Sequence, residues 1–334
     1  MARWGIVGLG EFAQKWAKDV FENYKLEQNA PEQVLVAVVS TSSLAKADQF
    51  VRDLKLNQDT SVSTFDDYNQ FLEADIDVVY VAAPNSAHFS LAKSAIDAGK
   101  HVLLEKTFTT SHEEAVILQK SARKNNVFLL EAVWTRFLPS TKKIWDLVDQ
   151  KTIGDIIQVS ADLSHLVPYE PQQRLFNPDL GGGVLFDSII YSITWTFGLL
   201  RSKSSNYTTT GLTVASKSGV DGGATVVLAF PDLGAFGIAT GSFYGESPPY
   251  AVTIQGSKGT IYVDRASRPS KAIVHVHGES ERELDLNFEG LGYFYEANEV
   301  ARAIKRGDLE TELYPVDQSV EIVKILEEIR NKSV

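Results

Sequence analysis

The chain has 334 residues, of which 44% are hydrophobic and 22% charged, and this length and composition predict a globular protein of two domains. Its net charge of −11, without a run of lysine and arginine, disfavours nucleic acid and anionic lipid as partners and leaves a small molecule as the expected one. The absence of cysteine excludes disulfides, cysteine nucleophiles and thiolate metal sites. It also fits a cytoplasmic protein, as does the lack of a secretory signal and of an apolar run of the ~18 residues that a membrane span needs.

Up to about residue 131, short β-rich runs alternate with helical stretches. Strands are expected at 3–10, 34–40, 77–84, 101–106 and 127–133, with helices at 11–24, 44–56, 88–99 and 111–126. Ser111 and Glu114 are spaced as a capping box at the start of the last of these helices. Repeated βα units of this length predict an α/β Rossmann domain with a doubly wound parallel sheet over residues 1–131.

After about residue 150 the strands follow one another through Gly- and Pro-bearing turns, without helices between them. This pattern predicts a largely antiparallel open sheet. One helix, at 184–198, precedes most of these strands, and two more, at 292–306 and 316–332, follow them. Residues 132–334 are therefore expected to form an α+β domain that binds substrate and mediates dimerisation.

The segment GLGEFA at 8–13 matches the G-x-G-x-x-A pattern of dinucleotide-binding turns, directly after a strand and opening a helix. Gly8 allows a tight turn, Gly10 lets the backbone approach a pyrophosphate, and Ala13 packs the helix against the sheet. The alternative is a turn needed only for packing. On the first interpretation the cofactor-binding candidates are Gly8, Gly10, Glu11, Phe12 and Ala13.

The residues after the second strand indicate the type of dinucleotide. An Asp or Glu there binds the ribose of NAD, but this chain has Ser40, Thr41, Ser42 and Ser43. Hydroxyl groups can bind a 2′-phosphate, and Lys46 would add positive charge. We therefore favour NADP, with NAD as the alternative, and expect Ser43 to cap the next helix in either case.

Ligands of such sheets bind beyond the carboxyl ends of the strands, where the sequence HVLLEK ends in Lys106. A lysine in that crevice can move the proton that accompanies hydride transfer at a carbinol carbon. The alternative is a surface lysine paired with Glu105. The same argument brings Glu131 to the mouth of the crevice and adds as cofactor-binding candidates Ala83, Pro84, Asn85, Glu105 and Lys106.

In the second domain, a Gly run opens an apolar helix in which Asp187 and Tyr191 lie four residues apart, on one face. An ionisable aspartate in such a helix needs a partner, and a nearby tyrosine hydroxyl would make an acid/base assembly. Alternatively, Asp187 is a helix-end charge and Tyr191 a core residue.

These motifs resemble the glucose–fructose oxidoreductase/inositol dehydrogenase family. The resemblance rests on the turn at 8–13, the Glu-Lys pair at 105–106 and the Gly-rich helix with Asp187. The segment EAVWTRFLPS at 131–140 and Tyr191, where many relatives have histidine, are most similar to the dimeric dihydrodiol dehydrogenase branch, which includes NADP-dependent D-xylose dehydrogenases. The resemblance to the family extends over nearly the whole chain.

The resemblance implies that Lys106 is the acid/base, that Asp187 orients the assembly, and that Tyr191 hydrogen-bonds the reacting oxygen. It also implies a homodimer formed through the open face of the C-terminal sheet. The remaining residues that it implies are Tyr80, His88 and Arg136 at the cofactor and Trp134 with Tyr191 at the substrate. The alternative for His88, which opens a helix, is that it only hydrogen-bonds backbone groups. His165, in a loop, is a further candidate for the edge of the substrate pocket.

One position departs from the family pattern. Where relatives have a proline after the Glu-Lys pair, often with a cis bond, this chain has Thr107. Either the bond is trans and Lys106 points elsewhere, or the fold keeps it cis. His275 and His277 alternate on a strand without a third ligand, so no metal site is expected.

The expected function is hydride transfer between NADP and a carbinol carbon of a sugar or trans-dihydrodiol. The rival hypothesis is a cofactor-sensing regulator on the same fold, because fold alone does not fix function. The presence of Lys106, Asp187 and Tyr191 together favours the enzyme, since a sensor has no use for a proton relay.

Overall fold

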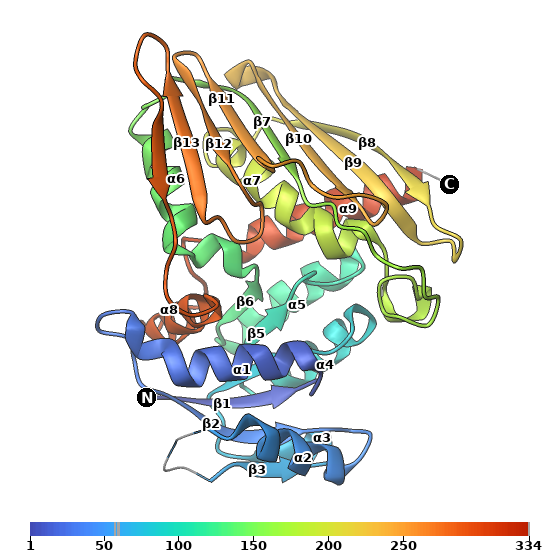
Figure 1. The fold of residues 1–334 in the computed structure, drawn as a ribbon. Coiled ribbons are helices and arrows are strands. Elements are labelled where there is room, and N and C mark those ends of the chain that lie inside the picture. The colour runs from blue at the N-terminus through green and yellow to red at the C-terminus, as the bar shows by residue number, and fades with distance from the viewer. Residues whose placement is uncertain (57, 59–60, 333–334) are drawn as a thin grey trace. The chain divides into compact units, whose positions relative to one another are not determined.

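The computed structural model describes residues 1–56, 58 and 61–332, which divide into two compact units (Figure 1). The first comprises Met1–Trp134 with Glu289–Val323, and the second comprises Thr135–Phe288 with the chain from Lys324 onwards. The sequence-based division assigned everything after residue 131 to the second domain. The structure instead groups residues 289–323 with the first unit.

The first unit is built on a six-stranded parallel sheet in the order β3-β2-β1-β4-β5-β6. This order is that of dinucleotide-binding doubly wound folds, so the expected Rossmann fold is confirmed. Its strands are β1 Ala2–Val7, β2 Gln33–Val39, β3 Ser63–Phe65, β4 Val78–Val81, β5 His101–Glu105 and β6 Leu129–Ala132. Its helices are α1 Glu11–Asn23, α2 Leu44–Leu54, α3 Tyr68–Glu73, α4 Asn85–Asp97, α5 His112–Asn125 and α8 Tyr293–Arg306. The sequence analysis missed β3 and α3, whose three and six residues are too few for a clear periodicity.

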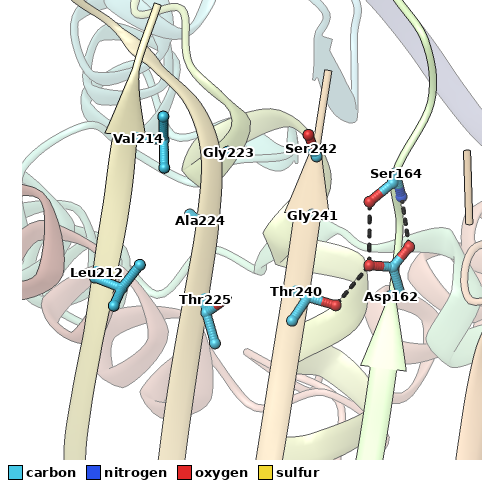
Figure 2. Close-up of a pocket in the computed structure, with 10 residues that line it drawn as sticks. All are labelled: Asp162, Ser164, Leu212, Val214, Gly223, Ala224, Thr225, Thr240, Gly241 and Ser242. Atoms are coloured by element: carbon cyan, nitrogen blue, oxygen red, sulfur yellow. Dashed lines mark hydrogen bonds between the residues drawn. The ribbon is translucent and has the colours of Figure 1, made fainter. Parts of the chain in front are cut away.

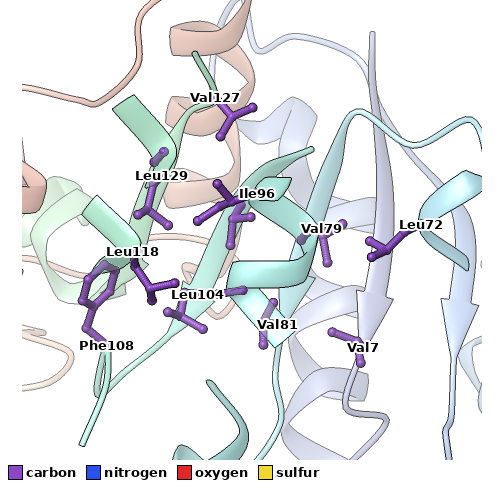
Figure 3. Packing of buried hydrophobic residues seen from close by; sticks show 14 of the residues in the cluster. Val7, Leu72, Val79, Val81, Ile96, Leu104, Phe108, Leu118, Val127 and Leu129 are labelled. Carbon is purple, nitrogen blue, oxygen red and sulfur yellow. The ribbon is translucent and has the colours of Figure 1, made fainter. Parts of the chain in front are cut away.

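Alternate residues of these strands enter two apolar layers, because successive side chains of a strand point to opposite faces. Figure 3 shows the layer in which Val79, Val81 and Leu104 of the sheet pack with Ile96 of α4 and Leu118 of α5. Burial on both faces explains why the strand sequences are continuous apolar runs.

Hydrogen bonds between α1 and the segment around α8 explain why residues 289–323 belong to the first unit. The buried carboxylate of Asp19 accepts from the backbone N–H groups of Leu291, Gly292 and Tyr293 at 2.7–2.9 Å. The Trp16 indole donates to Glu296 at 3.1 Å. These contacts link residues more than 270 positions apart, which a reading of local patterns does not detect.

The second unit contains an eight-stranded sheet in the order β14-β13-β12-β11-β7-β10-β9-β8, antiparallel except where β10 pairs with β7. The expected α+β architecture is thus confirmed. Its strands are β7 Ile156–Asp162, β8 Thr208–Ala215, β9 Asp221–Phe230, β10 Ala235–Ser242, β11 Val252–Gly256, β12 Gly259–Val263, β13 Lys271–Val276 and β14 Arg282–Asp285. Its helices are α6 Pro139–Asp149 and α7 Ile190–Arg201, together with the end of α9 Val316–Lys332.

Helix α7 covers one face of this sheet and approaches β10 closely. A Cβ atom at Gly237 would lie 2.8 Å from Thr196 of α7, so glycine permits the contact. By length and composition alone the helical segment Pro178–Arg201 is apolar enough to span a membrane, contrary to the expectation, but its most apolar part is wholly buried inside the protein. Burial on all sides accounts for its composition.

Two local expectations need correction. The predicted helix at 184–198 begins with a π-helical turn, Leu185–Ile189, before α7. Ser111 is the N-cap residue of α5, but its side chain makes no capping hydrogen bond. By contrast, the Ser43 hydroxyl accepts from the Lys46 backbone N–H at 3.3 Å, as predicted.

Candidate functional site

The turn between β1 and α1 has the geometry that dinucleotide binding requires. Gly8 has φ +90°, and a Cβ atom there would lie 2.5 Å from the backbone of Ala82 and Ala83. Gly10 is the N-cap of α1 in an extended conformation, with no atom within 4 Å of a would-be Cβ. The space beside Gly10 is therefore open, and Gly10 stands at the start of α1, where the first N–H groups of a helix lack partners within the helix and can bind a pyrophosphate.

The neighbouring residues divide into packing and exposed positions. Ala13 is buried, as its helix-packing role requires, whereas Glu11 and Phe12 are exposed. At the end of β2, the Ser40 and Ser42 hydroxyls are hydrogen-bonded to each other at 2.9 Å. Thr41 and Lys46 are exposed and carry the polar groups expected for a 2′-phosphate.

Lys106 directly follows β5, and its backbone is held on both sides. Its N–H donates to Glu105 Oε2 at 3.2 Å, and Glu105 Oε1 accepts from the Tyr80 hydroxyl at 2.6 Å. The Lys106–Thr107 peptide bond is cis, which decides between the two alternatives for this position. Two residues beyond Lys106, the Phe108 N–H donates to Glu131 Oε1 at 2.8 Å.

Glu131 is buried and 1% exposed, so the expectation that it lines the mouth of the crevice is wrong. Its second oxygen accepts from the Tyr314 hydroxyl at 3.0 Å. Burial raises the pKa of this carboxyl, while its hydrogen bonds and the charge of Lys106 oppose the rise. Glu131 thus fixes the backbone two residues beyond Lys106 from within the core.

His88 joins the ends of β4 and β5. Its Nδ1 lies 2.8 Å from the Thr107 carbonyl oxygen and its Nε2 lies 2.9 Å from that of Ala83. Burial lowers the pKa of the ring, although the two carbonyl oxygens favour its protonated form. His88 and Tyr80 are both 0% exposed and both position backbone or carboxylate groups. Their place at the cofactor stays a prediction. Pro84 and Asn85, at the start of α4, follow Ala83.

A second buried carboxyl group lies in the same unit and was missed by the sequence analysis. Glu296 of α8 is 1% exposed and accepts from the Trp16 indole, which stacks on Tyr80 with ring centroids 3.9 Å apart. Burial, then the charge of Glu105, raises the pKa of Glu296 well above its usual value. Its surroundings thus favour the neutral form of Glu296, beside the carboxylate that holds Lys106. Its position between two tyrosines and an asparagine in YFYEAN gives no sign of this.

An aromatic group adjoins the nucleotide-binding turn. Tyr293 has its ring centroid 5.3 Å from that of Phe12 and 4.7 Å from that of Trp134. Trp134 is 8% exposed, and its predicted contact with substrate stays a prediction. Tyr293 is the first residue of α8. Tyr293 therefore contacts both Phe12, in the first turn of α1, and Trp134.

In the second unit, Asp187 and Tyr191 are both 8% exposed and lie about one turn apart, on the π-helical turn and on α7. Asp187 Oδ1 accepts from Arg174 Nη1 at 2.9 Å. The Arg174 side chain is 59% exposed, while that of Asp187 is 11% exposed. Arg174 is therefore the partner that a buried aspartate requires, and the sequence analysis missed it because the loop conformation around 165–180 was not predictable.

Two further candidates lie among aromatic rings of the second unit. The Arg136 guanidinium lies 4.0 Å from the centre of the Trp145 ring, and it would clash with any side chain at Gly198 of α7. Its contact with a cofactor stays a prediction. The ring of His165 packs against Phe243 at 5.6 Å, and its place at the substrate pocket also stays a prediction.

The open face of the eight-stranded sheet carries a cavity of about 240 Å³ (Figure 2). Asp162 lies at one side of it and accepts hydrogen bonds from the hydroxyls of Ser164 and Thr240. Leu212 and Val214 form the apolar side. None of the predicted catalytic residues lines this cavity. Among the described residues, no group of His, Asp and Glu has the arrangement of a metal site.

Comparisons with known proteins follow the division into two units. Residues 2–132 match the model of an oxidoreductase family with an NAD-binding Rossmann fold, and residues 141–262 match the GFO/IDH/MocA C-terminal domain. The D-xylose 1-dehydrogenase (NADP⁺) of Hypocrea jecorina is 32% identical over 98% of this chain and 90% of its own length. The trans-1,2-dihydrobenzene-1,2-diol dehydrogenase of Mus musculus is 27% identical over 98% and 96%. A 3-ketoreductase from Actinomadura kijaniata, solved with NADP, shares the fold with a TM-score of 0.82 at 21% identity, covering 99% of this chain and 98% of that one.

Proposed function

Because the chain belongs to the GFO/IDH/MocA oxidoreductase family, we propose that it is an NADP-dependent dehydrogenase acting on a carbinol carbon of a sugar or trans-dihydrodiol. The observation that carries this proposal is the way Lys106 is held. Three buried ionisable side chains, Glu105, Glu131 and His88, fix the backbone around it. Burying ionisable groups is costly, and a surface lysine without a role would not require such support.

The proton steps are assigned to this chain's own residues. Lys106 accepts the hydroxyl proton when the carbinol is oxidised, and it returns the proton in the reverse direction. The Tyr191 hydroxyl hydrogen-bonds the reacting oxygen, and Asp187, held by Arg174, keeps the assembly oriented. When bound, the nicotinamide supplies or accepts the hydride.

NADP is proposed over NAD because the end of β2 offers hydroxyl and amino groups where NAD-binding turns have a carboxylate. Thr41 and Lys46 are exposed there, and the relative from Hypocrea jecorina is named for NADP. The substrate class, a sugar or a trans-dihydrodiol, is proposed from the names of this relative and of the murine one.

The test is NADPH formation at 340 nm, with D-xylose, D-glucose and a trans-dihydrodiol as substrates and NAD as the alternative cofactor. Lys106→Met and Tyr191→Phe should each reduce turnover by ~10²-fold or more. Lys124→Met, an exposed lysine of α5, is the matched control and should retain activity. Tight NADP binding without turnover across a broad sugar and polyol panel would overturn the dehydrogenase and favour a cofactor-sensing regulator.

We also propose a cytoplasmic homodimer that forms through the open face of the second unit's sheet. Leu212, Val214 and Phe236 expose 61%, 56% and 38% of their surface on that face, and apolar surface of this kind favours association. The molar mass in solution, measured by light scattering, should be twice that of the chain. Leu212→Glu should lower the molar mass, and a wild-type molar mass equal to that of one chain would refute the dimer.

A further inference from the structure

The helix that carries Asp187 and Tyr191 receives its N-terminal cap from a distant strand. Asp221, the first residue of β9, is 7% exposed, and its Oδ2 accepts from the Leu185 backbone N–H at 2.6 Å. Leu185 is the first residue of the π-helical turn, and its own N-cap residue, Val184, makes no side-chain capping bond. The first N–H groups of a helix have no partner within the helix, so the Asp221 carboxylate supplies both an acceptor and a favourable charge.

The fit between Asp221 and the start of this helix is close. Gly183 has φ +121°, and a Cβ atom there would lie 2.5 Å from Asp221 Oδ1. The Gly183 carbonyl oxygen accepts from the Asp187 N–H at 3.1 Å, and its N–H donates to the Leu175 carbonyl oxygen at 2.9 Å. Gly183 therefore contacts the Asp221 carboxylate, the Asp187 backbone and Leu175, which is the residue next to Arg174.

The charges around Asp221 agree with a capping role. Burial raises the pKa of its carboxyl, while the N–H groups of Leu185 and Val184 and the charge of Arg330 on α9 oppose the rise. The Arg330 guanidinium lies 4.8 Å from the centre of the Phe186 ring, within the same π-helical turn. The carboxylate is thus enclosed among the groups that fix this turn.

We propose that Asp221 is a positioning residue of the dehydrogenase reaction, which acts by anchoring the first turn of the helix and thereby placing Asp187 and Tyr191. The inference rests on the proposed function for its catalytic consequence. Its structural part, the anchoring of residues 184–191, does not depend on that function. Asp221 acts through the Leu185 backbone, so its removal should affect the chemical step more than cofactor binding.

The test compares Asp221→Ala and Asp221→Asn with Asp264→Asn. Asp264 is a matched control, because its carboxylate also accepts from two backbone N–H groups, those of Ser270 and Lys271 at 3.0 and 3.2 Å, but in a turn after β12. Asp221→Ala should lower kcat by about tenfold or more, since small misplacements of reacting groups cost up to ~10²-fold, with KM for NADP unchanged. Asp221→Asn keeps an acceptor oxygen and should recover part of kcat.

Amide hydrogen exchange, read on peptides covering 184–191, gives a second readout that does not require turnover. Both Asp221 variants should exchange faster there than the wild type, and Asp264→Asn should not. The proposal would be overturned if the Asp221 variants exchanged at the wild-type rate at 184–191 and kept kcat within twofold of the wild-type value. If the wild type turns over no substrate, the proposed function fails while the exchange rates still decide whether Asp221 anchors the helix. If Asp221→Ala does not fold, Asp221→Asn replaces it in both measurements.

Discussion

Replacing Gly10 by alanine should separate cofactor binding from folding. No atom lies within 4 Å of the added methyl group, and Gly10 has φ −89° and ψ 177°, which alanine adopts without strain. The weaker capping by alanine and the lower entropy of the unfolded chain, each worth about 0.5–1 kcal/mol, oppose each other. The free energy of unfolding should therefore change by less than about 1 kcal/mol.

Cofactor affinity should change far more. We expect a pyrophosphate to bind the N–H groups at the start of α1 and the added methyl group to obstruct its approach there. A hydrogen bond to a charged group is worth about 1.5–3 kcal/mol. Losing one such bond weakens binding by roughly 10- to 150-fold, at 1.4 kcal/mol for each factor of ten.

Titration of NADPH fluorescence gives the dissociation constant, and thermal denaturation without cofactor gives the stability. Gly8→Ala is the contrasting variant. Its φ of +90° and the 2.5 Å approach to the Ala82 backbone predict a lower melting temperature before any cofactor is added. Unchanged NADPH affinity in Gly10→Ala would refute the reasoning, because the phosphates would then lie elsewhere.

Three further predictions concern residues outside the turn. Ser43→Ala, which removes the cap of α2, should lower the free energy of unfolding by about 1 kcal/mol in urea unfolding, and an unaltered free energy of unfolding would argue against the cap. Arg174→Met removes the ion-pair partner of the mostly buried Asp187, so it should lower the melting temperature and also lower kcat by releasing Asp187; equal kcat for both proteins would contradict this role. Glu296→Gln keeps an acceptor for the Trp16 indole but cannot ionise. The pKa of Glu296 is raised in the folded protein, so the unfolded chain loses this proton at a lower pH than the folded one. The free energy of unfolding of the wild type therefore falls as pH rises from the ordinary glutamate pKa of about 4.3 towards the raised pKa of the folded state. The Gln variant should therefore gain relative stability between acidic and neutral pH in thermal melts, and a constant difference would count against a neutral Glu296.

The strands and helices of the first unit were predictable because their signals are local. A glycine turn after an apolar run, such as the one at Gly8, and the run of hydroxyl residues ending at Ser43 depend on residues close in sequence. The same holds for the position of Lys106, since a strand's carboxyl end lies at the binding edge of any doubly wound sheet. β3 and α3 escaped prediction because they are too short to show a period.

The partners of these residues were not predictable. Glu296 approaches Glu105 across more than 190 positions, and Asp221 meets Leu185 across 36 positions. Nor does sequence distinguish a ligand-binding histidine from a buried one: His88 follows the helix start as expected, but both its nitrogens face backbone carbonyl oxygens.

The sequence by itself determined the two architectures, the nucleotide-binding turn and the acid/base candidates Lys106, Asp187 and Tyr191, because periodicity and turn chemistry act between near neighbours. The tertiary structure decided which side chains hold those candidates. It also assigned residues 289–323 to the first unit. The physical reason is that burial and the charge of distant groups set the state of a buried carboxyl, as at Glu131 and Glu296, and both arise only when the chain has folded.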